Sequence, residues 1–275
     1  MDNRPIGFFD SGLGGLTSVH ALHEKLPKEK VIYFGDTART PYGSKSSDTI
    51  KEFATQIVDY LVSKDVKMII IACNTVTAMA LDFLKEKYPN IPILGVVEPT
   101  VKKVVSDGCK KVGVIATKAT IASDIYGKSI NKLEPSIEVH SLACPAIVPL
   151  VEEGFIDDEI MRLLIKNYMD DFVGKYKFDN LILGCTHYPL VASHFRELYP
   201  NIKLYNSSEE VVNDAAEILK QKDMLADETD LKDRYYASDL SDNFRDMIKL
   251  LCQERDSKIK CVNIDFALGS TNSNI

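Results

Sequence analysis

The stretch Met68-Ile-Ile-Ile-Ala-Cys-Asn-Thr75 decides the fold class, because it runs from an apolar strand directly into polar, reactive residues. Its apolar run shows no polar alternation, which is typical of a parallel strand covered on both faces. Asn74 and Thr75 are residues that begin helices, and they predict a helix from Val76 to Tyr88. Cys73 would then lie at a strand's carboxyl end and beside a helix N-terminus. Open parallel sheets bind ligands at that edge, and a helix N-terminus favours thiolate over thiol.

A second stretch, Asn180-Leu-Ile-Leu-Gly-Cys-Thr-His187, repeats this pattern, and a helix-like segment follows it after Pro189. Cys73 and Cys185 therefore close two buried strands in two halves of the chain, which indicates a site with opposed thiols. His187 is placed to hold the proton of Cys185 or to stabilise its thiolate. Four other cysteines lack this context and are expected to be ordinary small core residues: Cys109, Cys144, Cys252 and Cys261.

Length and composition exclude several classes of protein. The 275 residues suffice for one large or two smaller α/β units, and the net charge of −7 with interspersed signs offers no basic stripe for nucleic acid. The longest apolar runs have strand length, so we expect neither a membrane span nor a signal peptide, and we expect a cytoplasmic protein. Six cysteines without CxxC spacing favour reduced thiols over a disulfide framework or a zinc site.

Two loops in the first half follow predicted strands and are typical of binding loops. After a strand over residues 5–9 comes Asp10-Ser-Gly-Leu-Gly-Gly15, in which Asp10 and Ser11 would face a ligand while the glycines let backbone amides approach it. A tight turn that only caps a helix would have the same composition, and the spacing matches neither nucleotide-binding fingerprint. After a strand over residues 31–34, Pro41 and Gly43 would fix the backbone so that the Tyr42 hydroxyl and nearby amides reach a ligand.

The remaining chain predicts two βαβα series, followed by C-terminal elements that pack with the first half. In the first series we expect an amphipathic helix over 48–63 and a fourth strand over 91–97. In the second we expect a strand at 112–116, a helix at 119–133, a strand near 139–141, helices within 147–176 broken at Gly154, a helix at 190–199, a strand at 202–205 and a helix from Ser207. Strands near 235–236 and 261–264, with a helix between them, are expected to join the first half.

Four of these motifs together resemble the glutamate racemases, bacterial enzymes that make D-glutamate for peptidoglycan without a cofactor. They are DSGLGGLT from Asp10, PYG from Pro41, ACNT from Ala72 and GCTHYP from Gly184, and they occur in this order across about residues 5–210. Each motif alone is weak, but the set is specific. The resemblance implies an α/β fold of two similar lobes, each a mainly parallel sheet flanked by helices, with the active site in the cleft between them.

The resemblance also implies a division of the chain and a set of site residues. Residues 1–97 and 210–266 would form the lobe that carries Cys73, residues 98–209 the lobe that carries Cys185, and residues 267–275 a polar tail expected to be disordered. Cys73 and Cys185 would be the acid/base thiols, assisted by Asp10, Glu152 and His187. Substrate contacts are expected from Asp10, Ser11, Pro41, Tyr42, Gly43, Asn74, Thr75, Thr186 and His187.

The chemistry implied is inversion of Cα by a base on one face of the substrate and an acid on the other. No ligand spacing or lysine motif calls for a metal or pyridoxal, so we expect no cofactor and a small-molecule partner, L- or D-glutamate. A homodimer is compatible with the sequence. Three alternatives stay open: a related racemase acting on aspartate or a hydantoin, a two-lobed protein that binds an amino acid without chemistry, and a thiol redox protein whose sulfurs would approach bonding distance.

Overall fold

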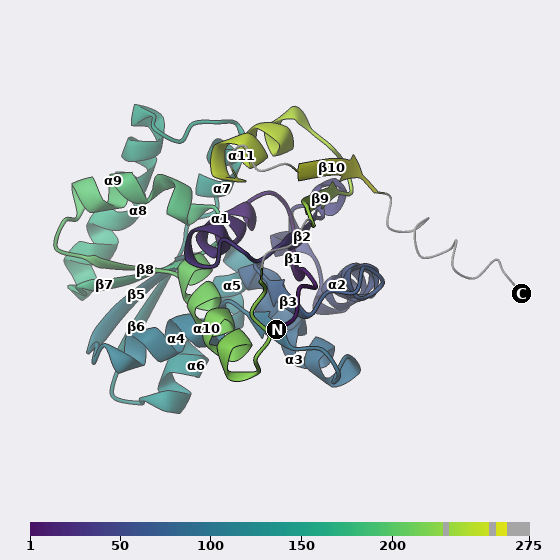
Figure 1. Cartoon of the computed structure of the whole chain (residues 1–275). Helices are drawn as coiled ribbons and strands as arrows, with labels where there is room; N and C mark the ends of the chain where they lie inside the picture. The colour runs from purple at the N-terminus through teal and green to yellow at the C-terminus, as the bar shows by residue number, and fades with distance from the viewer. Residues whose placement is uncertain (228–230, 253–256, 263–275) are drawn as a thin grey trace, which may run out of the picture.

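The structure is a computed structural model that describes residues 1–227, 231–252 and 257–262. Two separate parallel sheets organise these residues, and helices flank both sheets (Figure 1). The α/β class and the pair of mainly parallel sheets predicted from the sequence are confirmed.

The first sheet lies in the strand order β10-β9-β2-β1-β3-β4 within the described residues, and every pairing in it is parallel. Its strands are β1 (Ile6–Asp10), β2 (Val31–Gly35), β3 (Met68–Ile71), β4 (Ile93–Gly95), β9 (Asp233–Ala237) and β10 (Ser257–Cys261). The C-terminal strands thus extend the sheet of the first half at the β2 edge, as the sequence predicted.

The second sheet lies in the order β6-β5-β7-β8 and is also parallel throughout. Its strands are β5 (Lys111–Ala116), β6 (Glu138–Ala143), β7 (Asn180–Gly184) and β8 (Lys203–Asn206). The strands that lead to the two matched cysteines, β3 and β7, are both interior strands. Their continuous apolar sequences follow from this position, since helices cover an interior strand on both faces.

Helices connect the strands and form the outer layers. They are α1 (Leu16–Lys25), α2 (Ser47–Val62), α3 (Asn74–Lys87), α4 (Val97–Ser106), α5 (Lys118–Ser123), α6 (Ile125–Leu133), α7 (Ile147–Glu152), α8 (Glu159–Tyr176), α9 (Ala192–Leu198), α10 (Ser207–Gln221) and α11 (Asp242–Cys252), with short 3₁₀ turns η1 (Thr37–Arg39), η2 (Tyr42–Ser44) and η3 (Tyr188–Val191). Local sequence sets several starts: the Asn206 side chain, for example, accepts a hydrogen bond from the Ser208 amide at the start of α10.

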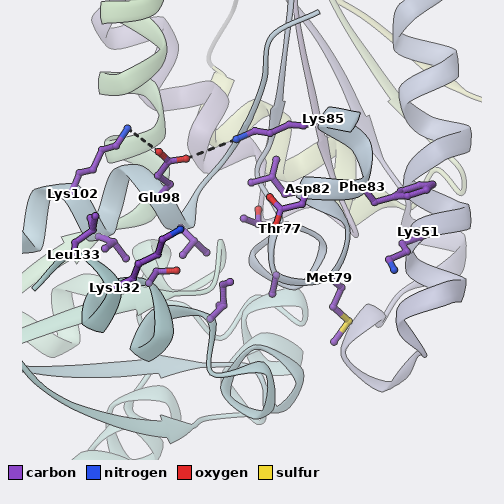
Figure 2. Close-up of a pocket in the computed structure, with 16 residues that line it drawn as sticks. Lys51, Thr77, Met79, Asp82, Phe83, Lys85, Glu98, Lys102, Lys132 and Leu133 are labelled. Atoms are coloured by element: carbon purple, nitrogen blue, oxygen red, sulfur yellow. Dashed lines mark ion pairs between the residues drawn. The ribbon is translucent and has the colours of Figure 1, made fainter. Parts of the chain in front are cut away.

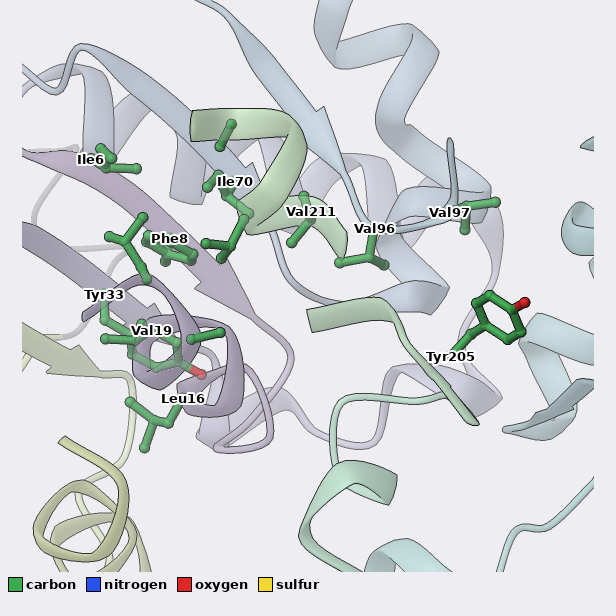
Figure 3. Close-up of a cluster of buried hydrophobic side chains, with 14 of the residues drawn as sticks. Ile6, Phe8, Leu16, Val19, Tyr33, Ile70, Val96, Val97, Tyr205 and Val211 are labelled. Carbon is green, nitrogen blue, oxygen red and sulfur yellow. The ribbon is translucent and has the colours of Figure 1, made fainter. Parts of the chain in front are cut away.

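One hydrophobic core continues from the first sheet to the second. Figure 3 shows Phe8 and Ile70 of the first sheet near Val19 of α1 and Val211 of α10, and the same buried cluster includes Val114 of the second sheet. Helix α10 packs against both α1 and α4. The opposite faces have separate cores, under α2 and α3 on the first sheet and under α7, α8 and α9 on the second. The two sheets therefore share a hydrophobic core on one of their faces.

The structure corrects some predicted boundaries. The single helix expected over 119–133 is two helices, α5 and α6, because Asp124 adopts a left-handed conformation with φ of 53°. The fourth strand is shorter than expected, since β4 ends at Gly95 and α4 begins at Val97. The predicted break at Gly154 is confirmed, with φ of +87°. Residues 263–264 of the last predicted strand and the predicted tail, 267–275, lie outside the described residues.

Candidate active site

Both matched cysteines lie where a strand has just ended. Cys73 caps the N-terminus of α3, two residues past β3, and Cys185 follows β7 directly. The two residues line one cavity of about 450 Å³. Other predicted site residues line the same cavity: Ser11, Pro41, Tyr42, Gly43, Asn74, Thr75, Glu152, Thr186 and His187. Of the residues named from the sequence, only Asp10 is absent from the lining, although it lies directly behind it.

Around Cys73 the surroundings favour the neutral thiol. Its Sγ atom donates a hydrogen bond to Ser11 Oγ over 3.4 Å. Burial raises the pKa of Cys73 to about 12, the negative charge of Asp10 acts in the same direction, and the hydrogen bonds with Ser11 and with the Val76 amide oppose it only in part. These surroundings therefore favour the protonated thiol of Cys73 at neutral pH.

Asp10 is a buried carboxylate that organises the glycine-rich turn. Its Oδ2 atom accepts hydrogen bonds from the amides of Gly12, at 3.2 Å, and Gly15, at 3.1 Å. Its other oxygen, Oδ1, is buried and has no hydrogen-bond partner within the described residues. Burial raises the pKa of Asp10, whereas His187 and the turn amides act to lower it. Asp10 therefore lies in electrostatic contact with both halves of the site without lining the cavity.

Around Cys185 the surroundings are cationic. His187 Nδ1 lies 3.9 Å from Cys185 Sγ, and His187 Nε2 lies 3.1 Å from Glu152 Oε1. Burial alone would lower the pKa of His187, but the interactions with Cys185 and Glu152 outweigh it and raise the pKa to about 10. An imidazolium next to a thiol favours the thiolate. The Glu152 carbonyl accepts a hydrogen bond from Asn243 Nδ2 of α11 at 2.7 Å, which fixes the end of α7.

Small residues allow the glycine-rich turn of the first half to reach the second. A Cβ atom at Gly14 would collide with His187 Nδ1 and Thr186 Oγ1, so no larger residue fits there without displacing the site. Next to it, Thr17 Oγ1 contacts the Thr186 carbonyl at 3.1 Å and Ser208 Oγ at 2.8 Å. The glycines predicted to admit a ligand thus admit the opposite half of the protein.

The loop of Pro41 and Gly43 lines the cavity as predicted, but the prediction for the Tyr42 hydroxyl was wrong. Tyr42 is buried, and its hydroxyl donates to the buried carboxylate oxygen Asp36 Oδ2. Asp36 is itself fully buried and binds Arg39 Nε at 2.7 Å and Ser238 Oγ at 2.8 Å. Tyr42 therefore anchors the loop through its hydroxyl and leaves the loop backbone at the cavity. This polar cluster depends on Ser238, which the sequence does not connect with the loop.

Several residues that line the cavity of the two cysteines were not predicted from the sequence. They are Thr40, Ser44, Thr117, Lys118, Pro145, Val148 and Pro149. Thr117 and Lys118 directly follow the carboxyl end of β5, and Pro145 follows β6 after Cys144, so the strand-end rule that selected the two cysteines would have found them. Thr117 Oγ1 lies 3.4 Å from Thr75 Oγ1, which joins the two halves at this side of the cavity.

A second cavity of about 420 Å³ lies between helices α3, α4 and α6 (Figure 2). There Glu98 forms ion pairs with Lys102 at 3.1 Å and with Lys85 at 3.8 Å, and Lys132 is also in the lining. Neither cysteine of the matched pair reaches it. The chemistry predicted from the sequence therefore belongs to the first cavity. No helix within the described part of the chain has the length and hydropathy needed to span a bilayer.

The sequence of this chain is similar to those of known racemases. Residues 17–215 match the family model described as Asp/Glu/Hydantoin racemase. The chain is 43% identical to a glutamate racemase of Streptococcus gordonii over 251 residues, which cover 90% of this chain and 94% of the relative.

Solved structures of glutamate racemases are also similar to this chain. A glutamate racemase of Francisella tularensis in complex with D-glutamate superposes with a TM-score of 0.89 at 40% identity and covers 97% of this chain and 100% of its own. A glutamate racemase of Thermus thermophilus in complex with β-chloro-D-alanine has a TM-score of 0.85 at 36% identity and covers 96% of this chain and 99% of its own. The chain therefore belongs to the Asp/Glu/hydantoin racemase family.

Proposed function

We propose that this protein interconverts L- and D-glutamate with Cys73 and Cys185 as its two acid/base groups and with no added cofactor. The observation that carries the proposal is the pair of strand-end cysteines, one from each sheet, that line a single cavity. The glutamate racemases at 40% and 43% identity support glutamate as the substrate.

In the L-to-D direction, the Cys185 thiolate removes the Cα proton and the Cys73 thiol delivers its own proton to the opposite face. This assignment follows from the motif resemblance, and two features favour it: His187 next to Cys185 stabilises a thiolate, and burial keeps Cys73 protonated. Turnover leaves a thiol at 185 and a thiolate at 73, which is the arrangement needed for the reverse reaction. A second L-to-D turnover requires a proton to return from Cys185 to Cys73.

The carbanion formed between the two steps needs donors around the substrate carboxylates, because the Cα–H of an amino acid is far less acidic than a thiol. Asn74 Nδ2 is buried at the cavity and has no partner within the described residues, so it is free to donate. Ser11, Thr75 and Thr186 offer hydroxyls in the same lining. Lys118 adds an ammonium group that complements the net negative charge of glutamate.

We also propose which parts of the chain close on the substrate and where the product is used. Residues 1–97 with 210–266 and residues 98–209 act as two lobes that close on the substrate, and Asp10, Glu152 and His187 assist the thiols. The product, D-glutamate, serves peptidoglycan synthesis in the cytoplasm, and the active protein is compatible with a homodimer.

The test is turnover of L-glutamate in D₂O without pyridoxal phosphate, followed by circular dichroism and mass spectrometry. We expect D-glutamate that carries deuterium at Cα, while unreacted L-glutamate stays mostly protiated early in the reaction. Unchanged optical rotation would refute the function. Early transfer of the substrate hydrogen into product would instead refute the two separate bases.

The open alternatives give different results in the same assay. A racemase for aspartate or a hydantoin would turn over those substrates at least as well as glutamate. A binding protein without chemistry would leave both enantiomers unchanged and would tolerate loss of both thiols. A redox protein would form a bond between Cys73 and Cys185, whereas these two residues form no disulfide in this structure.

A further inference from the structure

Tyr126 of α6 connects the two strand ends that carry the cysteines. Its hydroxyl donates a hydrogen bond to Asn74 Oδ1 over 2.7 Å, next to Cys73. Its ring packs on Gly184, next to Cys185, so closely that a Cβ atom at Gly184 would lie 3.1 Å from the Tyr126 ring. Tyr126 is only 2% exposed. One side chain therefore touches the residue after the first cysteine and the residue before the second.

The unexpected helix break at Asp124 places this tyrosine. The left-handed backbone of Asp124 ends α5 and starts α6 in a new direction, with Tyr126 and Ile130 on the buried face. The Asp124 carboxylate lies where a Cβ atom at Gly127 would be, so a larger residue at 127 would have to displace that side chain. A continuous helix over 119–133 would rotate Tyr126 relative to the sheet and take its hydroxyl away from Asn74.

The contact determines which end of the Asn74 amide stays unpaired. Because Tyr126 donates to Oδ1, the amide nitrogen Nδ2 of this cavity-lining residue is buried and has no hydrogen-bond partner in the described chain. The reverse orientation would present an oxygen to the substrate carboxylates, which would repel it. Burial raises the pKa of Tyr126, which favours the neutral phenol that donates this hydrogen bond.

We propose that Tyr126 is a positioning residue for the reaction: it holds the Asn74 amide with its NH₂ group toward a substrate carboxylate. The proposal rests on the proposed function, since it supposes a substrate with a carboxylate in this cavity. Tyr126 touches no substrate atom in this scheme and acts only through Asn74.

The first test replaces Tyr126 by phenylalanine, which keeps the ring on Gly184 and removes only the hydroxyl. We expect KM for glutamate to rise roughly tenfold while kcat changes less than about threefold, because the lost interaction is made in both the bound substrate and the transition state. The matched control is Tyr205→Phe, which removes a buried hydroxyl that contacts Cys109 at 3.1 Å and Asp107 at 3.0 Å, outside the cavity. Its KM should match that of the wild type, and the melting temperatures of both variants identify any general loss of stability.

The second test is a double-mutant cycle with Asn74→Ala. If Tyr126 acts through Asn74, Tyr126→Phe should raise KM less than about twofold once the amide is absent. A tenfold rise in that background would overturn the proposal, as would a Tyr126→Phe variant with wild-type KM. Binding of glutamate to all four proteins, measured by calorimetry, gives a second readout of the same cycle. A wild type that neither binds nor turns over glutamate refutes the proposed function itself, whereas an active wild type with an unchanged Tyr126→Phe variant refutes only the positioning role.

Discussion

The two cysteine-bearing strand ends have the same position in the fold and opposite electrostatic surroundings. Cys73 lies beside Ser11 and within the influence of the Asp10 carboxylate, and its pKa is raised to about 12. Cys185 lies beside His187, whose pKa is raised to about 10 and which also binds Glu152. Repetition of a strand–cysteine–helix pattern thus provides two similar positions for a thiol, while the neighbouring side chains place a carboxylate near one and a histidine next to the other.

This difference favours the thiol form of Cys73 and places a cation beside Cys185, which suits the proposed reaction on two faces of Cα. Two identical surroundings would favour two thiols or two thiolates, and neither state can both remove and deliver a proton. Each of the following variants removes one thiol or changes the surroundings of one thiol.

Removal of either thiol should have the largest effect. Cys73→Ala and Cys185→Ala should each lower racemisation by roughly 10³-fold or more in both directions, since each direction needs one base and one acid. Chiral chromatography of glutamate measures the loss. Cys261→Ala, at an exposed position, is the control and should retain normal turnover. Near-normal turnover by either of the first two variants would rule out the two-thiol mechanism.

Loss of the cation beside Cys185 should come next. We expect His187→Gln to lower kcat/KM about 10²-fold. The loss must be equal in both directions, because two enantiomers are equally stable in solution. His194→Gln is a matched control, since His194 is a similarly buried histidine that binds a backbone carbonyl, that of Ile156, at 2.8 Å. A His187→Gln variant with wild-type kcat/KM would show that the cation does not assist Cys185.

His187 also predicts a pH dependence of stability. Its folded-state pKa, about 10, lies above the value near 6.5 of a free histidine, so its charge stabilises the fold fully below about pH 6.5. That contribution is lost as the pH rises towards 10, because the unfolded chain releases this proton first. The difference in melting temperature between wild type and His187→Gln should therefore shrink over this range, and a constant difference would argue against a charged His187.

Alkylation should detect the difference between the two thiols directly. At pH 7, iodoacetamide should label Cys185 at least about tenfold faster than Cys73, because only the thiolate reacts. Peptide mass spectrometry at short times measures the ratio, and glutamate should protect both positions. Labelling of Cys73 should increase as the pH is raised, consistent with its pKa of about 12. Faster labelling of Cys73 at pH 7 would reverse the assignment of acid and base.

Glu152 should give the smallest effect of this series. Its carboxylate is 30% exposed, so solvent screens its interaction with His187, and we expect Glu152→Gln to lower kcat/KM by only about two- to fivefold. The neighbouring Glu153→Gln has the same chemistry outside the cavity lining and should match the wild type. A loss as large as that of His187→Gln would mean that Glu152 takes part in proton transfer itself.

Most of the fold could be predicted from local sequence. The apolar run before Cys73 and its repeat before Cys185 identify interior parallel strands, since only a strand covered on both faces needs such a run. Gly154 marks a helix break because glycine alone adopts its backbone conformation at low cost. Asp124 could not be identified in this way. Aspartate adopts the left-handed conformation more often than most residues but also occurs within helices, so its presence at 124 does not mark a break.

The class of fold, the two thiols, and the nearby residues Ser11, Asn74, Thr75, Thr186 and His187 could be predicted from local sequence, because each of these residues lies within a few positions of a strand end. The directions of the side chains depend instead on the packing of distant segments. This packing directs the Tyr42 hydroxyl to Asp36, it brings Tyr126 to Asn74, and it places Asp10 behind Cys73. The physical reason is that hydrogen bonds and charge interactions depend on distances of a few ångströms between segments far apart in the chain, and these distances exist only once the two sheets have packed together.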